Sequence, residues 1–481
     1  MEAPRAQEFL FHKLINQAKK TVFGIEHGFS EITSHEEFVK RVPIRDYEKL
    51  IPYIERIKAG EKNVLWPGKP VYFAKSSGTT SGVKYIPLTK DSIPNHINSA
   101  RNALLLYISE NKYSEFVNGK MIFLSGSPVL ENVNGILTGR LSGIVNHHIP
   151  KYLKGNQLPS YSTNCIEDWE QKVDAIVEET YNQNMTLISG IPPWVQMYFE
   201  KLLKKTGKKT IKEIFPNFNL LIYGGVNFEP YRSQLFKTIG EEINSIETYP
   251  ASEGFIAYQD LQKEKACLPG RQGLLLNVDS GIFFEFIPPA EVFNNNPTRL
   301  TIKDIELDVN YALVINSNAG LWGYLIGDTV KFVSKNPYRI VVTGRIKHFI
   351  SAFGEHVIAE EVEGALMELC NQVNIQVTEF TVAPQVNPKQ GLPYHEWLIE
   401  FAETPADTLS FSKKLDELMQ VKNIYYKDLI AGKILEPLHL SILPKESFRN
   451  YMKSVGKLGG QNKVPRLTND RILADSLLNA I

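Results

Sequence analysis

The sequence has few cysteines, no surplus of charge of either sign and no long apolar run. Its three cysteines, Cys165, Cys267 and Cys370, lie far apart without C-x-x-C spacing, which argues against a zinc site or a disulfide framework and favours a reducing compartment. The 53 basic and 53 acidic side chains balance, which argues against a nucleic-acid partner. No uncharged apolar run approaches the ~18–20 residues that span a bilayer, and the N-terminus lacks the apolar segment of a signal peptide. We therefore expect a soluble, cytoplasmic protein without nucleic-acid or membrane partners.

What is present is an alternation of short apolar runs with helical periods. At about 100–200 residues per domain, 481 residues suggest two to four domains. The runs of strand length are followed by amphipathic segments, and this alternation predicts a mixed α/β domain with substantial parallel pairing. The predicted strands are Val71–Ala74, Met121–Leu124, Thr186–Ile188 and Leu220–Tyr223, and the helices between them include Asp168–Gln183 and Trp194–Lys205.

The second half of the chain changes character twice. Residues 281–343 are denser in strands and predict a smaller β-rich part of the same domain. After Gly344-Arg345, helices near 358–369, 409–419 and 446–455 surround strands near 375–382 and 397–401, the pattern of a compact α+β domain. We therefore predict an N-terminal domain over residues 1–345 and a C-terminal domain over residues 346–481.

A run of small and hydroxyl residues, Ser76-Ser77-Gly78-Thr79-Thr80-Ser81-Gly82, separates two predicted strands. Such residues contribute nothing to a core, whereas glycines expose backbone N–H groups and hydroxyls add donors, so the run suits the phosphates of a nucleotide. Gly78 and Gly82 have three residues between them and no Gly-Lys-Ser/Thr follows, so this is not a Walker A loop. A flexible surface hairpin is the alternative that composition leaves open.

The run resembles the phosphate loop of the adenylate-forming enzymes, the superfamily of acyl-CoA synthetases and luciferase-like proteins. Within it, the chain is most similar to the auxin-responsive Gretchen-Hagen family of acyl acid amido synthetases, particularly its bacterial members. The likeness covers nearly the whole chain and rests on an ordered set of motifs: Val42-Pro43, Asp46-Tyr47, Trp66-Pro67-Gly68, Ser76–Gly82, Phe284-Glu285-Phe286, Gly320-Leu321-Trp322 and Val464-Pro465-Arg466. The resemblance implies a large adenylation domain followed by a small, mobile C-terminal domain.

Two further motifs, by resemblance, complete the nucleotide site. Within Glu247–Gly254, Tyr249 would lie along the adenine, and Ser252 or Glu253 would lie near the phosphates and Mg²⁺, since a hard cation prefers carboxylate oxygen. Gly224, after a predicted strand, would border the adenine. A helix cap or loop is the alternative for the first segment, and a simple β-turn with a glycine pair is the alternative for the second.

The third motif, Tyr324–Asp328, implies that Asp328 binds the ribose hydroxyls, because a carboxylate accepts two hydrogen bonds at once. Family members usually carry arginines beside this tyrosine, where this chain has Gly323 and Leu325. By resemblance, Lys347 reaches the phosphate at the junction between the domains, and Lys463 swings over the active site as a point charge. Solvated linker or loop lysines are the alternatives.

The acid-binding site is predicted from segments that match the family's acyl-site regions. Arg140 would pair with the carboxylate of the acid, with a structural salt bridge as the alternative, and Ile191 and Trp194 would line an apolar pocket. The spacing of Gly135, Gly139 and Gly143 predicts one face of a helix.

The chain is thus predicted to be a ligase that uses ATP and Mg²⁺ to adenylate a carboxylic acid and transfers the acyl group to an amine such as an amino acid. An acyl-CoA ligase with the same adenylate chemistry is the first alternative, and a nucleotide-binding pseudoenzyme is the second. Nothing in the sequence selects among acids such as auxin, jasmonate or benzoate.

Overall fold

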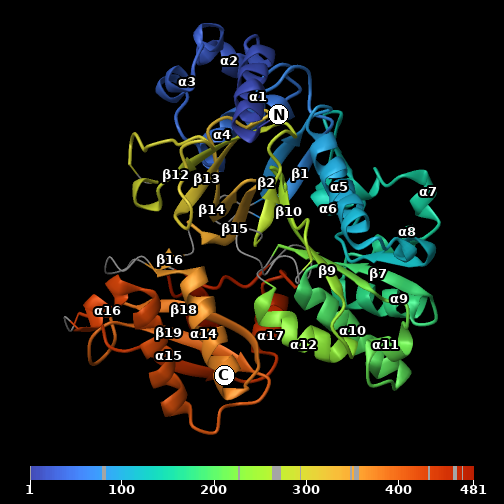
Figure 1. Ribbon diagram of the computed structural model, residues 1–481, viewed down its shortest axis with the longest axis vertical. Helices are drawn as coiled ribbons and strands as arrows, with labels where there is room; N and C mark the ends of the chain where they lie inside the picture. The colour runs from blue at the N-terminus through green and yellow to red at the C-terminus, as the bar shows by residue number, and fades with distance from the viewer. Residues whose placement is uncertain are drawn as a thin grey trace. The chain divides into compact units, whose positions relative to one another are not determined.

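The computed structural model describes residues 2–77, 83–225, 228–262, 272–292, 294–346, 349–350, 357–431, 434–458, 463–468 and 470–480. The chain divides into two compact units (Figure 1). Unit 1 comprises residues 1–226 and 236–342, and unit 2 comprises residues 227–235 and 343–481. Among the described helices, none is both long and apolar enough to cross a membrane.

Unit 1 is built around an eleven-stranded sheet, half of which is parallel. Its parallel strands are β6 (Gln157–Leu158), β3 (Lys120–Phe123), β7 (Met185–Ser189), β8 (Leu220–Gly224) and β9 (Asn244–Ala251). Helices α9 (Trp169–Thr180) and α10 (Pro192–Thr206) connect β6 to β7 and β7 to β8, and the Asp168 side chain caps α9 by accepting from the Gln171 N–H at 2.9 Å. The predicted mixed α/β fold with parallel pairing is confirmed.

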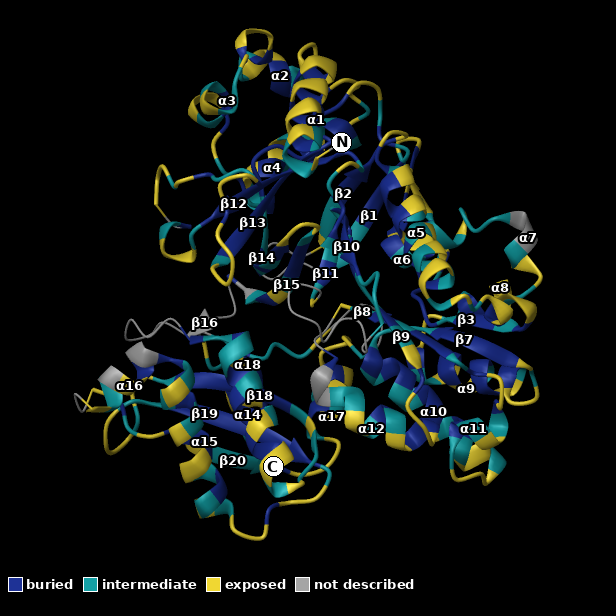
Figure 2. Cartoon of the chain, viewed as in Figure 1, coloured by how far each residue is buried: buried dark blue, intermediate teal, exposed yellow. Residues whose placement is uncertain are grey.

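The rest of this sheet is antiparallel where pairing is described, and corresponds to the predicted β-rich part. It continues from β9 through β10 (Gly254–Tyr258), β11 (Leu274–Leu276), β15 (Tyr338–Arg345), β14 (Tyr324–Lys335), β13 (Asn310–Ser317) and β12 (Ile282–Ile287). All six residues of β12 are buried, as expected for a strand covered on both faces (Figure 2).

A second, four-stranded sheet carries the approach to the predicted phosphate loop. Its strands follow the order β2 (Val83–Leu88), β1 (Tyr72–Ser77), β5 (Ile136–Arg140) and β4 (Glu131–Val133). Gly139 therefore lies in a strand and only Gly143 lies in a helix, α6 (Leu141–Asn146), so the predicted helix face through Gly135, Gly139 and Gly143 is wrong. Parallel pairing of β5 with β1 overrides the local spacing.

The remaining helices of unit 1 lie mostly near the N-terminus or cover the sheets. They are α1 (Ala3–Ala18), α2 (Val22–Glu26), η1 (Phe29–Glu31), α3 (His35–Arg41), α4 (Tyr47–Lys58), α5 (Ile93–Asn111), η2 (Glu115–Asn118), α7 (Lys151–Lys154), α8 (Tyr161–Asn164), α11 (Ile211–Ile214) and η3 (Pro289–Glu291). One apolar cluster joins α1 to β12, with Phe11 and Phe283 ring centroids 5.0 Å apart.

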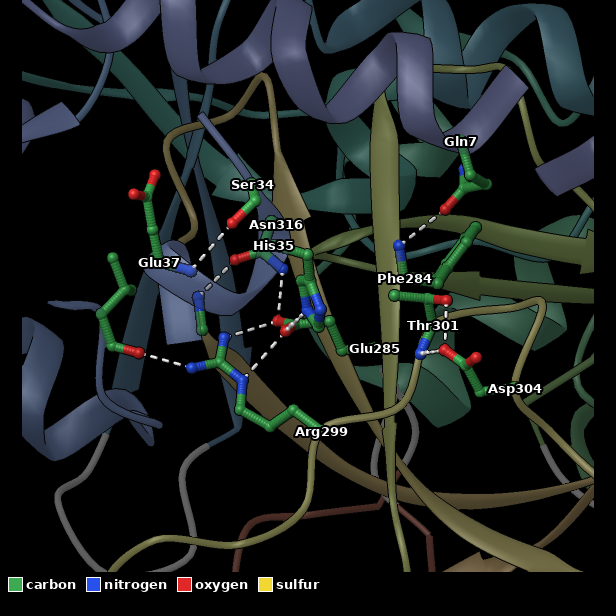
Figure 3. A network of polar contacts seen from close by, with 12 residues as sticks. Gln7, Ser34, His35, Glu37, Phe284, Glu285, Arg299, Thr301, Asp304 and Asn316 are labelled. Atoms are coloured by element: carbon green, nitrogen blue, oxygen red, sulfur yellow. Dashed lines mark hydrogen bonds and ion pairs between the residues drawn. The ribbon is translucent and has the colours of Figure 1, made fainter. Parts of the chain in front are cut away.

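A buried polar network ties this N-terminal region to the antiparallel strands (Figure 3). Glu285 on β12 is fully buried and accepts hydrogen bonds from Arg299 at 2.6 and 2.9 Å and from Asn316 at 2.7 Å. His35 on α3 lies 2.7 Å from the same carboxylate, and Arg299 also donates to the Val42 carbonyl. The network thereby fixes the segment that follows α3.

Unit 2 is an α+β structure around the sheet β18–β19–β20. Strands β18 (Val377–Gln385) and β19 (Tyr394–Phe401) are antiparallel, and β20 (His439–Leu443) is parallel to β19. The helices are α14 (Ala359–Val373), α15 (Thr408–Lys422), α16 (Ile424–Ala431), α17 (Ser447–Ser454) and α18 (Ile472–Leu478), and the short strands β16 (Phe349–Ile350) and β17 (Val357–Ile358) pair with each other. Helix α12 (Glu229–Ile239) begins in this unit and ends in unit 1.

Candidate active site

Strands β3, β7, β8 and β9 are parallel, so their carboxyl ends meet at one edge of the large sheet. Ser125-Gly126 follows β3, Gly190-Ile191 follows β7, Gly224 ends β8, and Tyr249 lies near the end of β9. In open α/β sheets, ligands bind outside the carboxyl ends of the strands. Of the residues predicted to contact the nucleotide or the acid, Ile191, Gly224 and Tyr249 therefore lie at this edge of the large sheet.

Gly224 is required by the packing of β8 on β9. A Cβ at this position would lie 2.3 Å from the Thr248 carbonyl oxygen, closer than any side chain tolerates. The Thr248 hydroxyl also donates to the Tyr223 carbonyl at 3.0 Å, which holds the two strand ends together. This close approach accounts for the glycine, and its predicted place beside the adenine stays a prediction.

Tyr249 and Asp328 are joined directly although three strands separate β9 from β14 in the sheet order. The Tyr249 hydroxyl donates to Asp328 Oδ2 at 2.6 Å, and both residues are buried. The sheet must therefore curve enough to bring the predicted second and third nucleotide motifs together. Because the second motif is predicted to contact adenine and the third ribose, this pairing suits a single nucleoside.

A second tyrosine–carboxylate pair lies between the same two motifs. The Tyr324 hydroxyl is 3.2 Å from Glu253 Oε1. Burial, followed by the charge of Glu253, raises the pKa of Tyr324 well above its usual range, so the phenol stays protonated and donates. Ser252 is buried in the turn that leads to Glu253. The carboxylates Glu253 and Asp328 thus supply oxygen atoms of the kind that a vicinal diol or a hard divalent cation needs.

Gly323 is required by the close packing of the segment that contains Pro43. It has φ +55°, and a Cβ would lie 2.8 Å from the Pro43 carbonyl oxygen. The Arg45 N–H donates to the Gly323 carbonyl, and the Leu325 N–H donates to the Arg45 carbonyl, both at 2.8 Å. The backbone on either side of Tyr324 is therefore bound to Arg45, which explains why no arginine stands at position 323. Nothing in the structure explains the leucine at 325.

The predicted phosphate loop is described only at its approach. Ser76 lies on β1, and Ser77 ends that strand. Since β1 and β5 are parallel with Lys75 opposite Arg140, Ser76 and Arg140 share one edge of the small sheet. Gly78, Thr79 and Thr80 lie outside the described residues, as does Lys347. Lys463 is described, and its side chain is exposed in unit 2.

The residues predicted to bind the acid differ in their surroundings. Arg140 is exposed, and its side chain runs along Gly126, where a Cβ would lie 2.7 Å from Arg140 Cδ. Trp194 is buried against Trp169, with ring centroids 4.6 Å apart. Ile191 is half-buried at the start of α10. Arg140 is thus the most exposed of the three and Trp194 the most buried, and the binding roles of all three residues stay predictions.

Sequence reasoning did not single out Lys172, which lies beneath this region. Its side chain is buried and donates to the Ser125 carbonyl at 2.9 Å and the Asn164 carbonyl at 2.7 Å. Burial lowers the pKa of Lys172 to about 8. A signal was available, because Lys172 follows Trp169 by three residues and so occupies the apolar face of α9. The lysine holds the backbone at the end of β3.

Comparison with known proteins places these features in a family. Models of the GH3 family match in chain order: the N-terminal domain over residues 1–160, the central domain over residues 275–345 and the C-terminal domain over residues 360–472. A jasmonoyl–L-amino acid synthetase, JAR4, from Nicotiana attenuata is 24% identical over 69% of this chain and 67% of its own.

Solved structures agree on the fold. The GH3.15 acyl acid amido synthetase superposes with a TM-score of 0.78 at 15% identity, covering 99% of this chain and 94% of its own. A 2-hydroxyisobutyryl-CoA ligase in complex with an acyl-AMP superposes with a TM-score of 0.57 at 12% identity, covering 99% of this chain and 90% of its own. On the three GH3 family domains matched in chain order, the chain belongs to the GH3 family.

Proposed function

We propose that the protein is an ATP-dependent acyl acid amido synthetase, a ligase that joins a carboxylic acid to an amine, such as an amino acid, through an acyl-adenylate. The observation that carries the proposal is the double pairing of Tyr249 with Asp328 and of Tyr324 with Glu253. It joins two motifs distant in the sequence beside the carboxyl edge of the parallel strands. Membership of the GH3 family supports the amide-forming chemistry.

The reaction has two steps. A carboxylate oxygen of the acid attacks the α-phosphorus of ATP, a P–O bond forms, and pyrophosphate leaves. The amine then attacks the acyl carbon, loses a proton, and AMP leaves with the electron pair of the mixed anhydride. Both steps depend on positioning and on neutralising charge more than on covalent help from the protein.

Each predicted residue has a role in this scheme. Asp328 accepts the ribose hydroxyls, and Tyr249 and Gly224 border the adenine. Ser76, Ser77, Gly78, Thr79, Thr80 and Ser252 donate to phosphate oxygens. Mg²⁺, when bound, neutralises triphosphate charge, and Glu253 is the residue we propose to hold it.

The remaining assignments concern the lysines and the acid. Lys347 and Lys463 act as point charges on the phosphate, and the C-terminal part, from residue 346, moves about residues 344–347 between the two steps. Arg140, Ile191 and Trp194 receive the acid. We also propose that the protein is a bacterial member of the family and acts in the cytoplasm, as predicted from the sequence.

An acyl-CoA ligase is the second candidate, because the fold is shared with a CoA ligase and the first half-reaction is the same. Gly323 does not favour a nucleotide-binding pseudoenzyme. The glycine is explained by the packing of Pro43 and Arg45 against it, and not by loss of a catalytic residue.

Acid-dependent ATP–pyrophosphate exchange tests adenylation without an acceptor. Indolyl, aryl, cyclopentanone-type and fatty acids would be assayed in turn, with Lys463→Ala as the control variant. Exchange with one acid class, lowered in Lys463→Ala while ATP binding persists, supports the proposal. ATP binding without exchange for any acid would favour the pseudoenzyme.

A further inference from the structure

The Arg466 side chain forms hydrogen bonds with unit 2 residues on three elements, α12, α14 and β18. Its Nε donates to Glu363 Oε1 on α14 at 3.0 Å, and its Nη1 binds Glu379 on β18 and the Phe380 carbonyl. Its Nη2 donates to the Tyr231 hydroxyl on α12 at 2.7 Å, and that hydroxyl donates to Glu379 Oε2 at 3.2 Å. Residues 231, 363, 379 and 380 all belong to the same unit as Arg466.

The guanidinium also stacks on a ring and is nearly closed to solvent. Its carbon lies 4.6 Å from the Phe380 ring centroid. The side chains of Arg466, Glu363 and Glu379 are 11%, 10% and 14% exposed, so the ion pairs are shielded and not the weak surface kind. An arginine side chain can bind two carboxylates, a carbonyl and a hydroxyl at once, because its planar guanidinium carries five N–H donors.

The backbone around Arg466 is held to the edge of β18. The Val382 N–H donates to the Arg466 carbonyl at 2.9 Å, and the Thr468 N–H donates to the Val382 carbonyl at 3.0 Å. The Thr381 hydroxyl donates to the Pro465 carbonyl at 2.7 Å. Residues 465–468 are therefore fixed on unit 2 by side chain and main chain together.

Lys463 lies three residues before this anchor. An extended chain spans at most about 3.3–3.6 Å per residue, so the Lys463 Cα stays within ~11 Å of the Arg466 Cα. Its side chain is exposed. The anchor thus limits the region that the Lys463 ammonium group can reach.

We infer that Arg466 is a positioning residue that holds the segment carrying Lys463 on unit 2, so that the lysine reaches the reacting phosphate from a fixed base. The inference rests on the proposed function for the role of Lys463 and on the described contacts for the anchoring. Loss of the anchor lowers turnover without weakening the binding of ATP or the acid, because Arg466 itself contacts neither in this scheme.

Graded variants avoid leaving two buried carboxylates without a cation. Arg466→Lys keeps the charge and loses the fork, and Tyr231→Phe removes only the hydroxyl. Arg471→Lys is the matched control, because Arg471 in the same unit also binds two carboxylates, Glu396 at 2.6 Å and Asp475 at 2.9 Å.

Two measurements are made on the full-length wild type and on each full-length variant. Amide hydrogen exchange at Val382 and Thr468 reports the anchor, and kcat and KM for acid-dependent pyrophosphate exchange report its use. We expect Arg466→Lys to speed amide exchange and lower kcat, each about tenfold, with both KM values within about twofold. Tyr231→Phe should give smaller changes in the same direction, and Arg471→Lys should leave both amides and kcat unchanged.

Several outcomes would overturn the inference. Unchanged amide hydrogen exchange at Val382 and Thr468 in Arg466→Lys would show that Arg466 does not anchor the segment. Faster amide exchange with an unchanged kcat would make Arg466 structural only. A wild-type protein without acid-dependent pyrophosphate exchange would refute the proposed function and with it the catalytic half of the inference, whereas the amide data would still decide whether Arg466 anchors the segment.

Discussion

Glu285 shows how one buried carboxylate organises its surroundings. It is fully buried and binds Arg299, Asn316 and His35 (Figure 3). Replacing it by glutamine leaves the Arg299 guanidinium, only 2% exposed, without its counter-ion. We expect Glu285→Gln to lower the free energy of unfolding by about 3–5 kcal/mol at pH 7, measured by urea denaturation. A loss below about 1 kcal/mol would contradict the importance assigned to the network.

The same residue predicts an acid-sensitive stability. Burial alone would raise the pKa of Glu285, but the charge of Arg299 and hydrogen bonds from His35 and Arg299 hold it at about 2. Since the unfolded pKa is about 4.3, the folded state binds fewer protons between these values. The contribution of Glu285 is therefore complete above pH ~4.3 and is lost as the pH falls towards 2. The stability difference between wild type and Glu285→Gln should narrow over that window, and a constant difference would refute the assignment.

Asp328 carries the residue-scale prediction for the nucleotide. If its carboxylate accepts the ribose hydroxyls, Asp328→Asn replaces one acceptor by a donor and raises the KM for ATP about tenfold, equivalent to ~1.4 kcal/mol. The KM for the acid should change less than twofold in pyrophosphate exchange. Tyr249→Phe serves as the control for packing, because it removes only the hydroxyl that donates to Asp328. Equal rises in both KM values would indicate general damage to the site.

At the scale of elements, the beginning of β14 depends on two glycines, one just before the strand and one within it. Gly323 and Gly327 both have positive φ, +55° and +96°, but only Gly323 has a carbonyl oxygen, that of Pro43, in the way of a Cβ. Left-handed backbone costs a non-glycine residue about 1–3 kcal/mol. Both alanine variants should lose that stability, and Gly323→Ala should lose more because Pro43 must also move. Thermal unfolding of the two variants side by side tests this, and equal losses would show that the Pro43 contact is inconsequential.

The elements themselves were largely predictable from local pattern. Apolar runs of strand length became β3, β7 and β8, because a buried parallel strand needs such a run. The helix face drawn through Gly135, Gly139 and Gly143 was wrong, because β5 is set by pairing with β1 across the intervening sequence. Local spacing carries no information about such distant partners.

The candidate site was predictable as a set of motifs and not as a geometry. Tyr249 and Asp328 were named from resemblance, but their hydrogen bond joins residues 79 apart and depends on the curvature of the whole sheet. Lys172 was not singled out, although its position three residues after Trp169 indicates the apolar face of α9. The packing that requires Gly323 comes from Pro43, far away in the chain, and no local pattern announces it.

At the scale of the whole molecule, the proposed chemistry is divided between the two units. Unit 1 holds the tyrosine–carboxylate pairs and the edge proposed to receive the nucleotide and the acid, and unit 2 holds Lys463 with its Arg466 anchor. Neither unit alone contains every proposed group. We therefore expect a fragment of residues 1–345 to retain ATP binding, measured by calorimetry, and to lose pyrophosphate exchange. Full exchange by that fragment would contradict a role for Lys463.

The central claim is that the acyl group passes from an adenylate to an amine. The most direct measurement is mass spectrometry of the products after incubation of the protein with ATP, Mg²⁺, the acid that supports exchange, the twenty amino acids and CoA together. The account predicts an N-acyl amino acid and AMP in equal amounts, absent when ATP is withheld. An acyl-CoA thioester as the product, or ADP in place of AMP, would contradict it.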